Sequence, residues 1–199
     1  MTEQTSPAAQ AKYQVRFDWG TAGATAIGQD ADVVVLVDAL PPTDADAAER
    51  ASAALITALP ESAAVLSAGL TTASAAARWI LDEQVRLGRR ALVSLVAAGS
   101  AAWTATPAPG LRFAVEDQLA AGAIIDALAT LGIDYSSPEA AVACAAFTGL
   151  RRAVGHLLTA SVSGQEQLAG GRSLSEIGEF GRVDSAAAVT VLRASSLPE

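Results

Sequence analysis

The chain has 199 residues, of which 51% are hydrophobic and 17% are charged, and its formal net charge is −8. A chain this apolar can offset the entropy lost on folding, which excludes an intrinsically disordered protein. Its 13 lysines and arginines form no run longer than the pairs at 89–90 and 151–152, whereas nucleic-acid binding needs clustered positive charge. We therefore expect a folded protein that does not bind nucleic acid.

The first residues and the single cysteine bear on the cellular compartment. Residues 1–12 (MTEQTSPAAQAK) lack the apolar core of a signal peptide, and no apolar run reaches the 18 residues of a membrane span. Cys144 has no cysteine partner within the chain. We expect a cytoplasmic protein without membrane contact, with a frayed tail over 1–12 and one domain over 13–199. A homo-oligomer is compatible with these features.

Strand-like and helix-like patterns alternate in the first half of the chain. Four short runs are typical of strands: 13–19, which alternates as in a half-buried strand, and 33–37, 62–67 and 90–99, which are mostly continuous apolar runs. Helical periodicity predicts helices over 43–59 and 71–88. This alternation predicts an α/β fold, a three-layer α/β/α domain with a mostly parallel or mixed sheet.

The second half is largely helical after a loop rich in proline at 103–110. Residues 116–132 place apolar side chains three and four apart and end at Gly132. A further helix is predicted over 136–150, with Ser137 as N-cap and Pro138 at the first helical position.

Asp38 directly follows the apolar run at 33–37. Ligands of open α/β sheets bind outside the carboxyl ends of strands, and a carboxylate there can hold Mg²⁺ or orient a water. The alternative is a solvated strand end without function. The phosphatase pattern Asp-x-Asp-x-Thr is disfavoured, because residue 40 is leucine.

Glu116 and Asp117 are adjacent carboxylates at the start of a predicted helix. Neighbouring residues on a helix point about 100° apart, so these two can share a ligand only with help from another element. With Asp38 as the third carboxylate they would form a metal site. Without it, each carboxylate only complements the helix dipole.

Further candidates lie at a predicted helix start and in a glycine-rich segment. Thr71 and Thr72 begin the helix predicted over 71–88, where free amides and hydroxyls can bind phosphate or simply cap the helix. Arg172 follows two glycines and can help to wrap an anion, although a flexible loop is the default interpretation. His156, the only histidine, lacks partners for a triad or a zinc site and is interpreted as an ordinary helix residue.

Taken together and in this order, five segments resemble the 2-phosphosulfolactate phosphatase family: VRFDWGTAGA at 15–24, ADVVVLVDAL at 31–40, EDQLAAGAII at 116–125, DYSSPEAAVA at 134–143, and 171–199. The resemblance runs from about residue 13 to residue 199 and is strongest in the second half. It implies a Mg²⁺-dependent phosphomonoesterase of α/β/α architecture. The substrate would be 2-phospho-3-sulfolactate, a small anionic phosphoester on a coenzyme M route.

The resemblance also implies roles for individual residues. The aspartate after the first buried strand matches Asp38, which is the catalytic candidate. With the matching acidic pair, the expected metal ligands are Asp38, Glu116 and Asp117. A Ser-Gly element and a following arginine of the family match Ser163, Gly164 and Arg172. The residues expected to bind phosphate are therefore Thr71, Thr72, Ser163, Gly164 and Arg172.

The sequence departs from the family pattern in two places. An Arg-Ala-Thr-Thr type stretch follows the aspartate in the family, whereas ALPPTDAD follows Asp38 here, and the Gly-Asn-Ser-Pro and Thr-Asn-Gly-Thr segments of the family are absent. A second hypothesis is therefore a shortened member that has lost catalysis and acts as a binding or assembly protein. A Rossmann-type nucleotide site is disfavoured, because Gly20, Gly23 and Gly28 do not have Gly-x-Gly-x-x-Gly spacing.

Overall fold

The computed structural model of the chain describes residues 6–44, 46, 52–53, 55–57, 59–99 and 111–196. The loop predicted at 103–110 lies outside the described residues. Of the helix predicted over 43–59, the described residues 46, 52–53 and 55–57 are helical. None of the helices in the described part of the chain is long and apolar enough to cross a membrane.

Five strands form one mixed sheet at the centre of the molecule: β1 (Val15–Trp19), β2 (Val33–Val37), β3 (Ala64–Ala68), β4 (Val93–Ala97) and β5 (Thr190–Arg193). Their order across the sheet is β1-β4-β2-β3-β5. The pairs β1–β4, β4–β2 and β2–β3 are parallel, and β5 runs antiparallel to β3. The predicted α/β fold with a mostly parallel sheet is confirmed.

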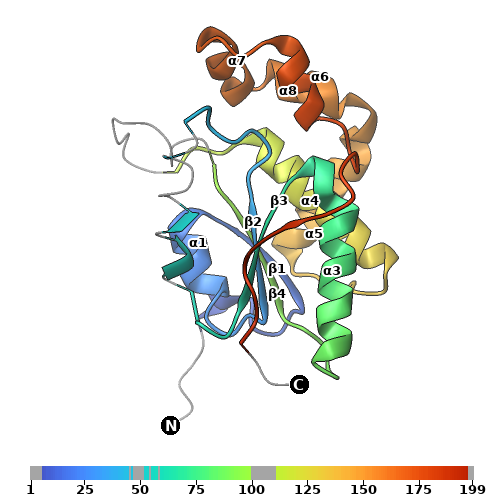
Figure 1. The fold of residues 1–199 in the computed structure, drawn as a ribbon. Helices are drawn as coiled ribbons and strands as arrows, with labels where there is room; N and C mark the ends of the chain where they lie inside the picture. The colour runs from blue at the N-terminus through green and yellow to red at the C-terminus, as the bar shows by residue number, and fades with distance from the viewer. Residues whose placement is uncertain are drawn as a thin grey trace.

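Helices cover both faces of the sheet, as Figure 1 shows. The α-helices of the described ranges are α1 (Gly20–Ile27), α3 (Ala73–Arg86), α4 (Val115–Thr130), α5 (Pro138–Leu150), α6 (Val154–Ala160), α7 (Val162–Ala169) and α8 (Leu174–Phe180). Helix α1 lies on one face, and α3, α4 and α5 lie on the other (Figure 1). Helices α6, α7 and α8 lie together above one end of the sheet, the end at which the parallel strands finish. We call these three helices the cap.

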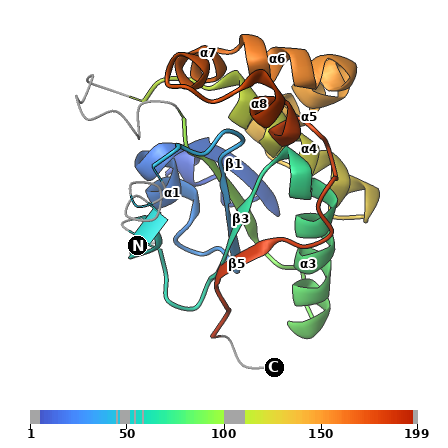
Figure 2. The ribbon, with the colours of Figure 1, turned by 45° about the horizontal axis from the view of Figure 1, so that its top comes forward.

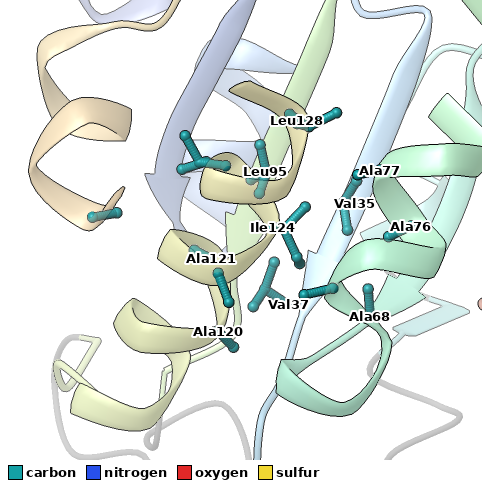
Figure 3. Close-up of a cluster of buried hydrophobic side chains, with 14 of the residues drawn as sticks. Val35, Val37, Ala68, Ala76, Ala77, Leu95, Ala120, Ala121, Ile124 and Leu128 are labelled. Carbon is teal, nitrogen blue, oxygen red and sulfur yellow. The ribbon is translucent and has the colours of Figure 1, made fainter. Parts of the chain in front are cut away.

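Two apolar clusters explain why the β2 run is continuous. Val33, Val35 and Val37 belong to the cluster under α3 and α4, whereas Val34 belongs to the cluster with α1. Successive side chains of a strand point to opposite faces, so a strand covered on both sides must be apolar throughout. In Figure 3, Val35 and Val37 lie among the side chains of α3 and α4, many of which are alanines. These small side chains let both helices pack closely on the sheet.

Within the tail expected over residues 1–12, Gln10 is buried against β1, whereas most of the other described residues of this segment are exposed. A short 3-10 helix, η1 (Pro7–Ala9), is capped by Ser6. Gln10 is 8% exposed, and its side-chain amide donates to the carbonyl of Phe17 (2.8 Å) and accepts from the amide of Phe17 (3.1 Å). The physical reason is that β1 is an edge strand, whose main-chain groups need partners.

Arg16 breaks the alternation expected over 13–19, because it is fully buried on the face expected to be polar. Its guanidinium pairs with Asp30 and donates to the carbonyls of Tyr13 (3.0 Å) and Ala11 (3.3 Å). A buried guanidinium is tolerated when a carboxylate and carbonyl oxygens satisfy it. Arg16 thereby fastens the segment before β1 to the strand.

Candidate functional site

A cavity of about 220 Å³ lies at the end of the sheet that the cap covers. Its walls come from the loop after β2, from Gly99 after β4, from the start of α4 and from α7. Its polar lining includes Asp38, Thr43, Glu116, Asp117, Ser163 and Glu166. The structure therefore brings the three carboxylates predicted from the sequence to one site, together with Ser163.

Asp117 connects the exits of two neighbouring strands. Its side chain is buried, Oδ1 accepts the amide of Ala39 (2.8 Å) after β2, and Oδ2 accepts the amide of Gly99 (2.9 Å) after β4. Burial raises the pKa of Asp117 well above its ordinary value of 3.8, the charge of Asp38 raises it further, and the two amide donors oppose this shift. Asp117 thus holds the backbone after β2 and the backbone after β4 together at the cavity.

Asp38 lies where the sequence predicts it, directly after β2, and it is half-buried. Its Oδ1 accepts the amide of Leu40 at 3.2 Å. Burial raises the pKa of Asp38 from 3.8 to about 6, the Leu40 amide opposes the shift, the charge of Glu116 adds to it, and the charge of Arg172 lowers it. The pKa of Asp38 therefore lies above that of an ordinary aspartate.

Glu116 is the least satisfied polar side chain at this site. It is 2% exposed, and its Oε2 has no hydrogen-bond partner within the described ranges. Burying a carboxylate oxygen without a partner is costly, and native proteins show few such atoms. Since Glu116 lines the cavity, a water or a ligand bound there can be the partner of Oε2.

Arg172, an expected phosphate ligand, lies beside the cavity and not in its lining. Its Nη1 donates to the carbonyl of Pro41 (3.0 Å), and its guanidinium stacks on Phe180 of α8, 5.1 Å from the ring centre. Gln167 of α7 donates to the carbonyls of Leu40 (2.8 Å) and Pro41 (3.2 Å). Together these two side chains hold the loop after β2 against the cap.

Ser163 and Gly164 serve different purposes although they are adjacent. Ser163 lines the cavity from α7. The amide of Gly164 donates to Ser161 Oγ (3.0 Å), and a Cβ on Gly164 would lie 2.0 Å from the carbonyl oxygen of Leu158. Gly164 is therefore required by packing between α6 and α7, and its amide is not available to an anion.

Thr71 and Thr72 are not brought to the cavity. They lie in the 3-10 helix η2 (Leu70–Thr72) after β3, where Thr72 Oγ1 accepts the amide of Gly69 (3.1 Å). The amide of Ser74, at the start of α3, donates to the carboxylate of Asp184 (2.6 Å). A carboxylate of the protein itself thus occupies the position at which a phosphate was expected.

Three polar side chains of the described lining have no counterpart among the sequence predictions: Thr43, Glu166 and Gln167. The glycine-rich pattern of residues 164–174, which include Glu166 and Gln167, predicts a flexible loop, but residues 162–169 form α7. No sequence signal identifies Gln167 as a partner of Leu40, because the two residues are far apart in the chain and meet only when the cap folds back.

The lining residues fit Mg²⁺ only in part. No group of three or more His, Cys, Asp or Glu side chains in the described part of the chain is arranged to hold a metal ion. Both oxygens of Asp117 accept amide hydrogens, so its carboxylate already has partners within the protein. Asp38 and Glu116 remain, and two carboxylates suit a hard cation that keeps several of its waters.

Comparison of the sequence with family models and with curated proteins does not identify the site. No family model matches the chain, and no curated protein matches it. The resemblance to the 2-phosphosulfolactate phosphatase family therefore stays a prediction from the segments quoted above.

Proposed function

We propose that this protein is a Mg²⁺-dependent phosphomonoesterase and that the cavity between Asp38, Glu116 and α7 is its active site. The observation that carries the proposal is the buried Oε2 of Glu116, which lacks a partner in the described structure and lies at a cavity that Asp38 also lines. Asp38 and Glu116 would hold the ion. When bound, Mg²⁺ would neutralise phosphoryl oxygens and lower the pKa of an attacking water.

The residues around these two carboxylates would have supporting roles. Asp117 holds the exits of β2 and β4 in place and thereby fixes the backbone next to Asp38. The hydroxyls of Ser163 and Thr43 line the same cavity and can donate hydrogen bonds to ester oxygens. Gln167 keeps the loop after β2 against the cap.

The charge of the lining explains why the metal would be indispensable. Four of the described lining residues are acidic, namely Asp38, Glu116, Asp117 and Glu166, and none is lysine or arginine. An anionic ester that enters this cavity meets charges of its own sign, and a divalent cation removes that repulsion. We therefore expect phosphate binding only in the presence of a divalent cation. The proposed substrate, by the family resemblance, is 2-phospho-3-sulfolactate.

Phosphate release from 2-phospho-3-sulfolactate, measured over a range of Mg²⁺ concentrations, tests the proposal. We expect release that EDTA abolishes and a loss of kcat/KM of at least about 100-fold in Glu116→Gln. Glu139→Gln is the matched control, because Glu139 occupies the first turn of α5 as Glu116 does in α4. Folded wild-type protein that releases no phosphate above buffer would contradict the proposal.

A second function is favoured by one specific observation. The described cavity lining has no basic side chain, and Arg172 donates to the carbonyl of Pro41. A protein that has lost catalysis and persists as a cation-dependent binding or assembly protein would have such a site. Calorimetric titration distinguishes the two functions: Mg²⁺ binding that Glu116→Gln removes, without turnover of the ester, favours the binding protein.

A further inference from the structure

One divalent cation at the cavity would balance only part of the charge of the proposed ester. A phosphomonoester group carries about two negative charges near pH 7, and the proposed ester also carries a sulfonate and a carboxylate. The described lining offers four carboxylates to these groups and no lysine or arginine. A second cationic group at the mouth of the cavity is therefore needed, and two arginines lie beside the described lining, Arg112 and Arg172.

Arg172 is already engaged by its neighbours. Its Nη1 donates to the carbonyl of Pro41 (3.0 Å) and to Gln167 Oε1, and its guanidinium stacks on Phe180. These partners belong to the loop after β2, to α7 and to α8. A turn of Arg172 toward a ligand would break the contacts that hold this loop against the cap. Arg172 is therefore unsuited to follow a ligand.

Arg112 lies at the mouth of the cavity, shortly before α4. A Cβ on Gly99, which lines the cavity, would lie 2.8 Å from the carbonyl oxygen of Arg112, so the main chain of Arg112 packs against the exit of β4. Ala114 also lines the cavity. The side chain of Arg112 reaches Glu166 of α7, with 3.4 Å between Nη1 and Oε1. In Figure 2, α7 lies over the segment that leads into α4, in agreement with this contact.

The ion pair between Arg112 and Glu166 can be exchanged at small cost. The two side chains are 49% and 59% exposed, and they meet in one long contact of 3.4 Å. Exposed pairs of this kind contribute at most about 1 kcal/mol. Glu166 lines the cavity from the same face of α7 as Ser163, three residues earlier. An anion that enters beside this face can therefore take the guanidinium from Glu166.

We propose that Arg112 binds the second anionic group of the substrate, a sulfonate or a carboxylate on the carbon skeleton of the ester, and leaves Glu166 when it does so. This inference rests on the proposed function, in which Asp38 and Glu116 hold the ion that meets the phosphate. The planar fork of donors on a guanidinium suits two oxygens of one acid group. The site would thus select phosphoesters that carry a further acid group over simple alkyl phosphates.

Calorimetric titration with two partial ligands in the presence of Mg²⁺ tests the inference. 3-Sulfolactate has the sulfonate and the carboxylate without the phosphate, and inorganic phosphate has neither acid group. We expect Arg112→Gln to weaken sulfolactate binding at least about 10-fold, because a charge-assisted hydrogen bond is lost. Phosphate binding should stay within about 2-fold, since the charge of Arg112 is exposed and screened. Arg112→Lys should recover part of the sulfolactate affinity. Glu166→Gln, which frees Arg112, should raise it about 2- to 5-fold.

Arg151→Gln is the matched control, because Arg151 is 56% exposed and pairs with Asp126 at 3.5 Å away from this cavity. It should change neither affinity. The opposite shifts of Arg112→Gln and Glu166→Gln cannot both come from a damaged fold. Equal sulfolactate affinity in wild type and Arg112→Gln would overturn the inference, as would weaker binding in Glu166→Gln or a wild type that binds phosphate alone. Phosphate binding that survives Glu116→Gln would instead reject the proposed function, and a wild type that binds neither ligand would reject both.

Discussion

At the scale of single residues, two aspartates of one cavity are used in different ways. Asp117 gives both of its oxygens to main-chain amides, whereas Asp38 accepts a single amide. Both are raised in pKa, chiefly by burial. The folded protein therefore retains protons on these groups at a pH at which the unfolded chain has released them, and its stability must depend on pH.

Asn in place of Asp38 should remove much of this pH dependence. The folded pKa of Asp38, about 6, lies above the ordinary value of 3.8. Between these values the folded state binds more protons than the unfolded state, so the free energy of unfolding falls as pH rises and levels off above about pH 7. Two pKa units correspond to an upper limit of about 3 kcal/mol. We expect Asp38→Asn, in EDTA at pH 7.5, to be about 1–3 kcal/mol more stable than wild type.

Urea unfolding across this pH range measures the effect. Asp134→Asn is the control, because Asp134 is exposed. The difference between the wild-type and Asp38→Asn curves reports Asp38 together with its coupling to Asp117. Curves for wild type and Asp38→Asn that stay parallel from pH 4 to pH 7.5 would show that Asp38 is not desolvated in solution.

At the scale of elements, the contact between α4 and α5 depends on one glycine. A Cβ on Gly122 of α4 would lie 2.1 Å from the carbonyl oxygen of Ala143 and 2.7 Å from Cβ of Phe147, both on α5. Main-chain atoms of a neighbouring helix cannot move away without moving the helix. Gly122 therefore sets how closely α5 packs against α4, which carries Glu116 and Asp117.

Gly122→Ala should destabilise the protein although alanine favours helices. The overlap with α5 should cost more than the gain of about 1 kcal/mol in helix propensity, with a net loss of about 1–3 kcal/mol. Gly149→Ala in α5 is the matched control, because a Cβ there meets nothing within 4 Å, and it should be neutral or stabilising by about 0.5 kcal/mol. Thermal unfolding compares the variants, and equal shifts for both would refute the close contact.

At the scale of the whole molecule, strands with a strong local pattern are predictable and those without one are not. The apolar runs of β2, β3 and β4 identify them as strands, because burial on both faces leaves only apolar residues. β5 lacks the apolar run of a strand that is buried on both faces, because it is largely exposed. Its partner β3 is also far away in the sequence, so no local pattern announces their pairing. The sequence of α1, GTAGATAI, does not predict a helix, because half of its residues are glycine or threonine, which are weak helix formers.

The site follows the same logic. The proximity of Asp38 to Glu116 and Asp117 is predictable, because the carboxyl ends of parallel strands and the first turns of the helices that follow lie at the same edge of an α/β sheet. The hydrogen bonds that Asp117 accepts from the amides of Ala39 and Gly99 are not predictable, because they depend on the angle at which α4 meets the sheet. The capping of α3 by Asp184 likewise requires the chain beyond the cap to return.

Removal of residues 1–12 tests how far the folded unit extends toward the N-terminus. Deletion removes the Gln10 contacts with Phe17 and takes the Ala11 carbonyl from the buried Arg16. With about 1 kcal/mol for each hydrogen bond, we expect a loss of about 3 kcal/mol, and a smaller loss for Gln10→Ala. Urea unfolding measures the stability of both variants. A truncated protein as stable as the full chain would show that residues 1–12 contribute nothing to stability and form a frayed tail.

The strand order also constrains when each strand can pair during synthesis. β1 is made first, yet its strand neighbour in the sheet is β4, whose Val93 pairs with Val15. β2 and β3 pair directly and are close in the chain, so the lower cost of closing the shorter loop favours them as the first contact. β4 then adds to the free side of β2, β1 joins beyond β4, and β5 arrives last at β3. β1, the first strand to leave the ribosome, therefore has no partner strand until residue 97, the end of β4, has emerged.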